Sequence, residues 1–186
     1  MRTLLTLPLL LLSLISFPSW GETIDDLVER DGIHYEKFSD VPFTGEVTGE
    51  WQGKFKNGKR EGQWVKYYDN GQLSIKGDYR NGRQEGPWVS YWDNGQLGNR
   101  VNYESGKKEG AYVDYFKNGH FQSKRHYKND KAHGLWIYYY GNGRIEAEIN
   151  CSEGKRHGPS AWYDKGGNLI VEHSGVFENG VKISDL

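Results

Sequence analysis

A repeat with a period of 24 residues is the feature that most restricts how this chain can fold. Three columns of identical residues recur at this period without a gap. The columns are Gly62, Gly86, Gly110, Gly134 and Gly158; Tyr67, Tyr91, Tyr115, Tyr139 and Tyr163; and Gly71, Gly95, Gly119, Gly143 and Gly167. A fixed short period indicates stacked units that each contact only their neighbours. The sequence therefore predicts a repeat array.

Each unit has the pattern of a β-hairpin. In the second unit, residues 64–68 are rich in β-forming side chains, and Asp69-Asn70-Gly71 is a strong turn signal. Residues 72–79 then alternate, with Leu73, Ile75 and Tyr79 expected on one face of the sheet. These features predict an all-β fold. It is an elongated, twisted antiparallel meander of stacked hairpins of about 24 residues that form a single-layer sheet.

Residues 1–21 have the pattern of a signal peptide. Arg2 precedes an apolar run from Leu4 to Phe17, and Ser19 and Gly21 have the spacing of small residues before a cleavage site. The run is short for a span of a bilayer roughly 30 Å thick. We therefore expect cleavage before Glu22 and export to the periplasm or the extracellular space, without a transmembrane segment in the mature chain. An uncleaved N-terminal anchor is the alternative.

The remaining chain divides into three parts. Residues 22–42 predict a capping hairpin around the turn Asp31-Gly32, the alternative being a short helix capped by Thr23 with Asp26. Residues 43–182 form the repeat array, with units that start near 43, 62, 86, 110, 134 and 158. Residues 183–186 are a C-terminal tail. The hairpin is expected to cover the first edge strand of the sheet.

Alternation along the first strand of each unit gives the sheet two unlike faces. The valine face carries the uniform columns of Val65 and Tyr67 and their repeats, and we expect it to be the packed interior. The tryptophan face carries larger and more varied rings. We expect these rings to form a partly exposed stripe for protein or glycan contact, made of Trp64, Tyr68, Trp88, Trp92, Tyr112, Phe116, Trp136 and Tyr140. The alternative is that they only pack between units.

The motif Gly-x-Trp-x-x-Tyr-x-x-Asn-Gly, followed by Tyr-x-Asn-Gly-x-x-Glu/His-Gly, resembles the MORN repeat in its bacterial variant form. The resemblance covers nearly all of residues 24–182. The opening segment, from Leu27-Val28-Glu29-Arg30-Asp31-Gly32 through Pro42-Phe43-Thr44-Gly45, is also similar to the start of such proteins, many of which carry the YwqK-type antitoxin label of toxin–antitoxin systems. The resemblance implies stacked β-hairpins, a role in binding or scaffolding with lipid contact in some members, and no catalytic residues.

Acidic and basic residues also fall into columns. The acidic column is Glu61, Glu85 and Glu109, and it follows a basic column of Lys59, Arg83, Lys107, Lys131 and Lys155. We interpret them as solvated turn residues in weak ion pairs, each worth about 0–1 kcal/mol. A charged ladder for a polar ligand is the alternative. Recurrence in every unit disfavours a single catalytic cleft, so no catalytic residue is assigned.

The remaining candidates for chemistry are isolated. His133 and His157 would stand about 10 Å apart in stacked units, too far to share a metal ion. Cys151 replaces a tyrosine of its column and is interpreted as a buried thiol. We therefore expect no metal and no cofactor.

These features favour an exported, non-enzymatic protein that binds another protein through its sheet surface, as a scaffold or in an antitoxin or immunity role. A module for cell-wall glycan and a peripheral lipid-binding protein are the alternatives. The net charge of −1 disfavours nucleic acid as a ligand, and it offers little attraction to anionic lipid. The sequence leaves the oligomeric state open.

Overall fold

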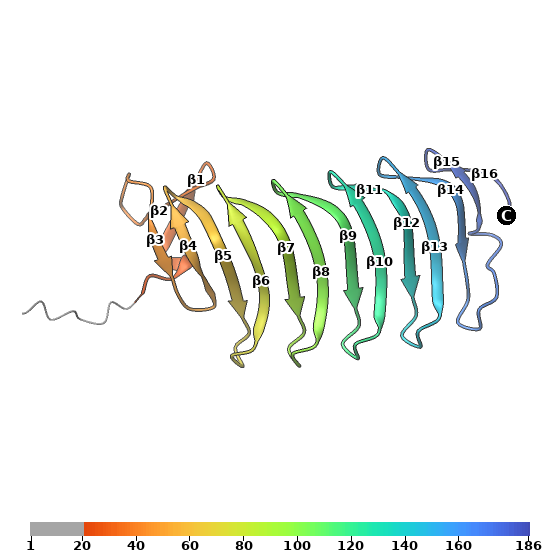
Figure 1. Ribbon diagram of the computed structural model, residues 1–186, viewed down its shortest axis with the longest axis horizontal. Coiled ribbons are helices and arrows are strands. Elements are labelled where there is room, and N and C mark those ends of the chain that lie inside the picture. Colours follow the sequence, from red (N-terminus) through yellow and green to blue (C-terminus); the bar gives the residue numbers. More distant parts are fainter. Residues whose placement is uncertain (1–20) are drawn as a thin grey trace, which may run out of the picture.

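The structure is a computed structural model that describes residues 21–186. Apart from Gly21, the predicted signal peptide lies outside the described residues. Fourteen strands form one antiparallel sheet in which sequence neighbours are spatial neighbours, except that the short β11 pairs only with β10. Figure 1 shows these hairpins side by side along the long axis of the molecule in a single layer. The predicted meander of stacked hairpins is confirmed.

The strands of the repeat array are β3 (Gly45–Val47), β4 (Trp51–Lys56), β5 (Lys59–Tyr67), β6 (Leu73–Arg80), β7 (Arg83–Tyr91), β8 (Leu97–Glu104), β9 (Lys107–Tyr115), β10 (Phe121–Lys128), β11 (Lys131–Ala132), β12 (Gly134–Tyr139), β13 (Ile145–Ser152), β14 (Lys155–Trp162), β15 (Gly175–Glu178) and β16 (Val181–Ser184). The strands β5 to β10 have similar lengths in successive units, and the strands at both ends of the array are shorter.

A short helical turn and a separate hairpin precede the array. The 3₁₀ turn η1 (Ile24–Asp26) is closed by Thr23, whose backbone N–H and hydroxyl both donate to Asp26 Oδ2, at 2.9 and 2.7 Å. β1 (Leu27–Arg30) and β2 (Ile33–Glu36) then pair around the predicted turn. Thr23 and Asp26 therefore cap a helical segment as the alternative prediction proposed, but this segment is a single 3₁₀ turn.

The N-terminal hairpin caps the array by packing on it rather than by extending its sheet. β1 and β2 form a sheet of their own, and Leu27 is buried in a cluster with the array residues Phe43, Val47, Phe55 and Trp64. The edge strand β3 is reached instead by the segment before η1, since the backbone N–H of Thr48 donates to the Glu22 carbonyl.

The tryptophan face is the packed interior, so the prediction that the valine face is the interior is wrong. The side chains of Trp64 and Trp88 are 0% and 6% exposed, whereas Val65 and Tyr67 are only half-buried. Rings from successive strands meet edge to face, as Trp64 does with Tyr79 and Tyr79 with Trp88, at centroid separations of 5.9 and 5.0 Å. Edge-to-face pairs add to the stabilisation that comes from burial alone. The core of this single-layer sheet is therefore formed by contacts between side chains of neighbouring strands on one face.

A bulge at the repeat glycine turns each tryptophan onto the neighbouring strand. Register jumps from Lys76–Val89 to Asp78–Glu85, so three residues of β7 oppose one of β6. Gly86 in this bulge has φ +67°, a left-handed conformation that favours glycine. Trp88 consequently lies over Gly77, and its indole N–H donates to the Asp78 carbonyl at 3.1 Å.

A second bulge places Leu73 on the opposite face from Ile75 and Tyr79. The pairing of β5 with β6 shifts between Lys66–Ile75 and Tyr67–Leu73, which leaves Ser74 as the extra residue. Leu73 therefore shares the valine face with Tyr67, while Ile75 and Tyr79 lie on the tryptophan face. Simple alternation placed all three together, and it failed because it assumed an unbroken strand.

Candidate functional site: a groove on the tryptophan face

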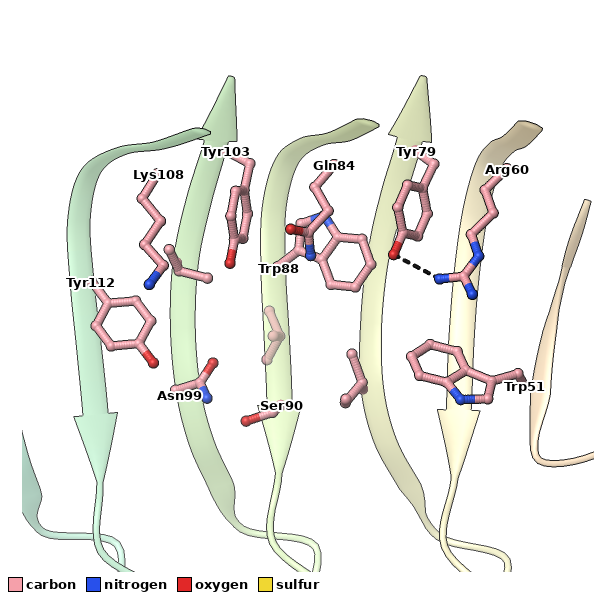
Figure 2. A pocket seen from close by; sticks show the side chains of 13 residues that line it. Trp51, Arg60, Tyr79, Gln84, Trp88, Ser90, Asn99, Tyr103, Lys108 and Tyr112 are labelled. Atoms are coloured by element: carbon pink, nitrogen blue, oxygen red, sulfur yellow. Dashed lines mark hydrogen bonds between the residues drawn. The ribbon is translucent and has the colours of Figure 1, made fainter. Parts of the chain in front are cut away.

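An open groove of about 380 Å³ runs across strands β4 to β9 on the tryptophan face. Figure 2 shows Arg60 and Lys108 at its two ends, with Tyr79, Gln84 and Tyr103 between them. The floor contains the polar side chains of Ser90 and Asn99. The groove is therefore amphipathic, with rings and cations together.

Arg60 is the most unusual group of the groove. Its guanidinium lies 4.8 Å from the Trp64 ring centroid and 5.3 Å from that of Tyr79, and its Nη1 donates to the Tyr79 hydroxyl at 3.0 Å. Its buried Nε has no hydrogen-bond partner in the structure, and no carboxylate of residues 21–186 forms an ion pair with it. A buried N–H donor without an acceptor costs free energy.

Lys108 occupies the equivalent position two units further along the array. Its ammonium lies 5.4 and 5.2 Å from the ring centroids of Tyr112 and Tyr127. Within the described part of the chain it has no ion-pair partner either. Burial raises the pKa of the Tyr103 and Tyr112 hydroxyls, so both remain protonated at neutral pH. This end of the groove is cationic and offers hydrogen-bond donors.

The other cations near the groove are neutralised. Lys66 pairs with Glu50 at 2.9 Å, and Arg125 pairs with Asp114, which also accepts the Ser123 hydroxyl at 2.5 Å. Arg60 and Lys108 therefore carry the uncompensated charge of the groove.

The predicted aromatic stripe is not one surface. The structure buries Trp64 and Trp88, and it holds Tyr112 and Trp136 half-buried in the same row. This burial excludes Trp64 and Trp88 as an exposed contact stripe. The other four residues lie beyond the strand ends, in the turns that join the strands of each hairpin, and they are Tyr68, Trp92, Phe116 and Tyr140.

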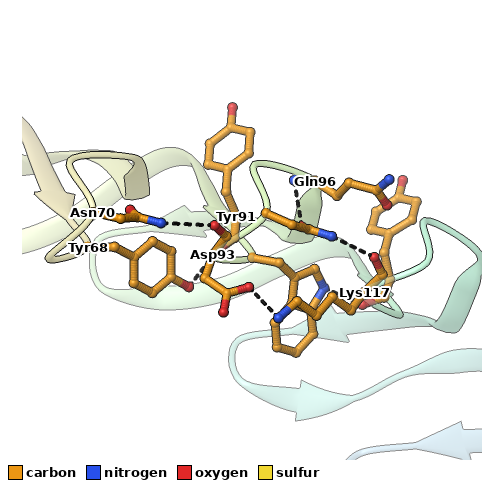
Figure 3. A network of polar contacts seen from close by, with 9 residues as sticks. Tyr68, Asn70, Tyr91, Asp93, Gln96 and Lys117 are labelled. Carbon is orange, nitrogen blue, oxygen red and sulfur yellow. Dashed lines mark hydrogen bonds and ion pairs between the residues drawn. The ribbon is translucent and has the colours of Figure 1, made fainter.

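These turn residues connect one unit to the next. The Tyr68 hydroxyl donates to the Tyr91 carbonyl at 2.7 Å, and the Trp92 indole N–H donates to the Tyr115 carbonyl at 3.0 Å. Figure 3 shows this network, in which the Asn70 amide also reaches the Asp93 carbonyl at 3.2 Å. Because the acceptor is 23 residues further on in each case, the contacts explain the 24-residue recurrence at these positions.

The acidic column has the same structural role at the other end of the hairpins. Glu61, Glu85 and Glu109 each accept a hydrogen bond from the backbone N–H of the next turn, at 2.8–2.9 Å. The interpretation as solvated ion pairs missed this role. The backbone donors belong to Asn81, Ser105 and Asn129.

The histidines and the cysteine form no reactive centre. Within residues 21–186 no group of three or more His, Cys, Asp and Glu side chains has an arrangement that could hold a metal ion. Burial raises the pKa of the Cys151 thiol, and the nearby Arg156 only partly opposes this effect. The thiol is therefore protonated at neutral pH and weakly nucleophilic.

The sequence did not indicate the groove, because the adjacent column has the more regular pattern of basic residues. The basic column singled out in the sequence begins at Lys59, at the exposed start of the strand. The groove is lined instead by Arg60, Gln84 and Lys108 of the next column, which continues as Ala132 and Arg156 in later units. The sign that could have identified it is the mixture of cationic, amide and small residues at a repeat position whose neighbours are nearly constant.

The fold and the groove together define a class: a repeat protein built from β-hairpins stacked side by side, with an open binding surface across several units. The family follows from comparison. The model of the MORN repeat variant matches residues 60–81, 84–105, 108–129 and 132–150. Residues 60–150 of the chain therefore contain four consecutive MORN repeats of this variant type. MORN repeats are typically non-enzymatic and often bind protein or membrane.

A comparison with curated proteins found no significant match. No helix in residues 21–186 has the length and apolar character needed to cross a bilayer.

Proposed function

We propose that this protein is an exported, non-enzymatic binding protein that holds a segment of another protein along the groove of the tryptophan face. The observation that carries the proposal is that the two cations lining this groove, Arg60 and Lys108, have no carboxylate partner within residues 21–186. The groove crosses six strands, which corresponds to about 24 Å at the usual strand spacing. That length suits an extended polypeptide segment better than a small molecule.

A protein ligand is favoured over a glycan by the state of the rings. Trp51 is the partly exposed tryptophan of the groove, and both Arg60 and Lys66 already lie over it, at 5.7 and 5.4 Å from its ring centroid. Cations therefore occupy the ring surface on which a sugar would stack. Lipid binding has no comparable support, because a chain with a net charge of −1 is only weakly attracted to anionic lipid.

Export is supported by the signal-peptide pattern of residues 1–21. If the partner is a toxin that acts outside the cytoplasm, the same binding constitutes an antitoxin or immunity function. Fractionation of the native cell tests the location, and mass spectrometry of the mature chain should give Glu22 as its first residue. A chain that stays in the cytoplasm with its leader intact would contradict export.

The binding is tested by crosslinking in the native cell with a photoreactive residue at Ser90, on the groove floor, or at Arg100, on the opposite face. We expect one protein to be crosslinked at stoichiometric yield from Ser90 and not from Arg100. Introducing Asn99→Trp to fill the groove should abolish this product, while Arg100→Gln should leave it. Equal crosslinking from both faces, or capture of wall polysaccharide instead, would overturn the proposal.

A further inference from the structure

We infer that the segment held by the groove is acidic, with two carboxylate side chains separated by about six residues of extended chain. This inference rests on the proposed function, since it specifies the partner of the same groove. It is carried by the placement of Arg60 and Lys108, the two groove cations that no carboxylate of residues 21–186 neutralises.

The charges favour an anionic ligand at two separate points. The cations next to the groove already have carboxylate partners, as Lys66 has in Glu50 and Arg125 has in Asp114. Arg60 contributes a guanidinium held between rings, with its Nε buried and without an acceptor. A carboxylate is the acceptor that a guanidinium binds best, because two parallel N–H donors match its two oxygens.

The spacing of the two cations defines the spacing of the acids. Arg60 in β5 and Lys108 in β9 hold equivalent positions two units apart, so four strand-to-strand steps separate them. Four steps span about 19 Å at the usual distance between strands, and an extended chain covers that distance in about six residues. A segment crossing the strands would thus place one carboxylate at each cation.

The middle of the groove suits the backbone between the two acids. Gln84 lies one unit from each cation, and its amide has no hydrogen-bond partner within residues 21–186. An amide can donate to a peptide carbonyl and accept from a peptide N–H. Because the segment crosses the strands, these contacts come from side chains and not from added sheet pairing. Arginine side chains at the acid positions would instead repel both cations.

The test is a set of dye-labelled synthetic peptides measured by fluorescence anisotropy against the full purified protein. Each peptide carries two glutamates in a Ser/Asn/Tyr background, separated by two to ten residues. We expect the affinity to be highest at a separation of five to seven residues. It should fall at least tenfold when both glutamates become glutamine, and it should weaken as salt rises.

Variants of the protein assign the effect to the groove. Lys108→Gln should weaken binding of the best peptide at least tenfold, and Arg60→Gln at least as much. Arg60 also packs on Trp64, so Arg60→Lys keeps the charge and should retain most of the affinity if the fold is intact by circular dichroism. The matched control is Lys76→Gln, which removes an exposed lysine of the valine face and should change nothing.

Each outcome separates this inference from the proposed function. Binding that ignores the glutamate separation, prefers basic peptides or survives Lys108→Gln would overturn the inference, as would no binding of any peptide. If the crosslinked partner of Ser90 were still lost on filling the groove, the proposed function would stand without it. If that partner did not depend on the groove, the proposed function itself would fail.

Discussion

The indole of Trp88 rests directly on the backbone of Gly77 in the neighbouring strand. A Cβ atom at Gly77 would lie 2.2 Å from Cδ2 of the ring, closer than any real contact. Trp64 has the same relationship to Gly53, where the distance would be 2.4 Å. In the next unit the pair is replaced by Val101 and Tyr112, which are register partners. A tryptophan is thus paired with a glycine on the neighbouring strand, and the smaller tyrosine is paired with a valine.

This match predicts a strong coupling between the two positions. Gly77→Val should destabilise the protein by about 1–3 kcal/mol, because the added side chain displaces the ring. Combining it with Trp88→Tyr copies the pair already present as Val101 and Tyr112. The double variant should therefore be more stable than the sum of the two single changes by at least about 1 kcal/mol.

Urea unfolding followed by circular dichroism measures this cycle. The control is Gly141→Ala, since Gly141 has open space around its Cβ position, and its backbone is not in the left-handed region. That variant should unfold within about 0.5 kcal/mol of the wild type. Additive effects at Gly77 and Trp88 would show that the two residues are not packed on each other.

The two tryptophans that the sequence placed on one stripe should respond differently to truncation. Trp64→Ala removes a fully buried ring and should cost about 3–5 kcal/mol. Trp92 is 36% exposed and donates a hydrogen bond to the Tyr115 carbonyl, so Trp92→Ala should cost less, about 1–2 kcal/mol. The comparison is made from the unfolding midpoints. If the two variants lost equal free energy of unfolding, Trp92 in the turn would contribute as much to the packed core as Trp64 in the strand.

The acidic column should act through hydrogen bonding rather than through charge. Glu109→Ala removes the acceptor for the Asn129 backbone N–H and should cost about 1 kcal/mol. Glu109→Gln keeps an acceptor oxygen and should lose less than half of that. The control is Glu104→Ala, because the Glu104 carboxylate makes no hydrogen bond or ion pair among residues 21–186. A glutamine variant as unstable as the alanine variant would indicate an electrostatic role.

His34 should make the stability fall in mild acid. Burial holds the pKa of its imidazole below the ordinary 6.5, and the hydrogen-bond geometry to the Gly58 carbonyl and the charge of Glu29 only partly oppose this. The unfolded chain therefore binds a proton more readily than the folded chain. Stability should be constant with respect to this group above pH 6.5 and should decrease as the pH falls below that value.

Thermal unfolding between pH 5 and 8 checks this sign. His34→Gln should lower the melting temperature at pH 8, because the ring packs on Phe55 at a centroid distance of 4.6 Å. The same variant should flatten the decrease below pH 6.5. If wild type and variant lost stability in parallel through this range, the decrease would belong to other groups.

Much of the candidate site could not be read from the chain. The columns of rings were visible, but their face and exposure depended on two bulges, which change the register by two residues and by one residue. Arg60 and Lys108 gave no signal of their own, because a cation in a strand is ordinarily solvated. Only the structure shows that these two have no carboxylate partner within residues 21–186.

The sequence by itself determined the repeat, the hairpins and the positions of the turns, because these depend on local preferences such as positive φ at asparagine and glycine. The tertiary structure decided which face is the interior. In a single layer, burial has to come from contacts between neighbouring units, and the large rings achieve it by lying over glycines of the adjacent strand. That fit depends on residues eleven positions apart, such as Gly77 and Trp88, and alternation within one strand cannot reveal it.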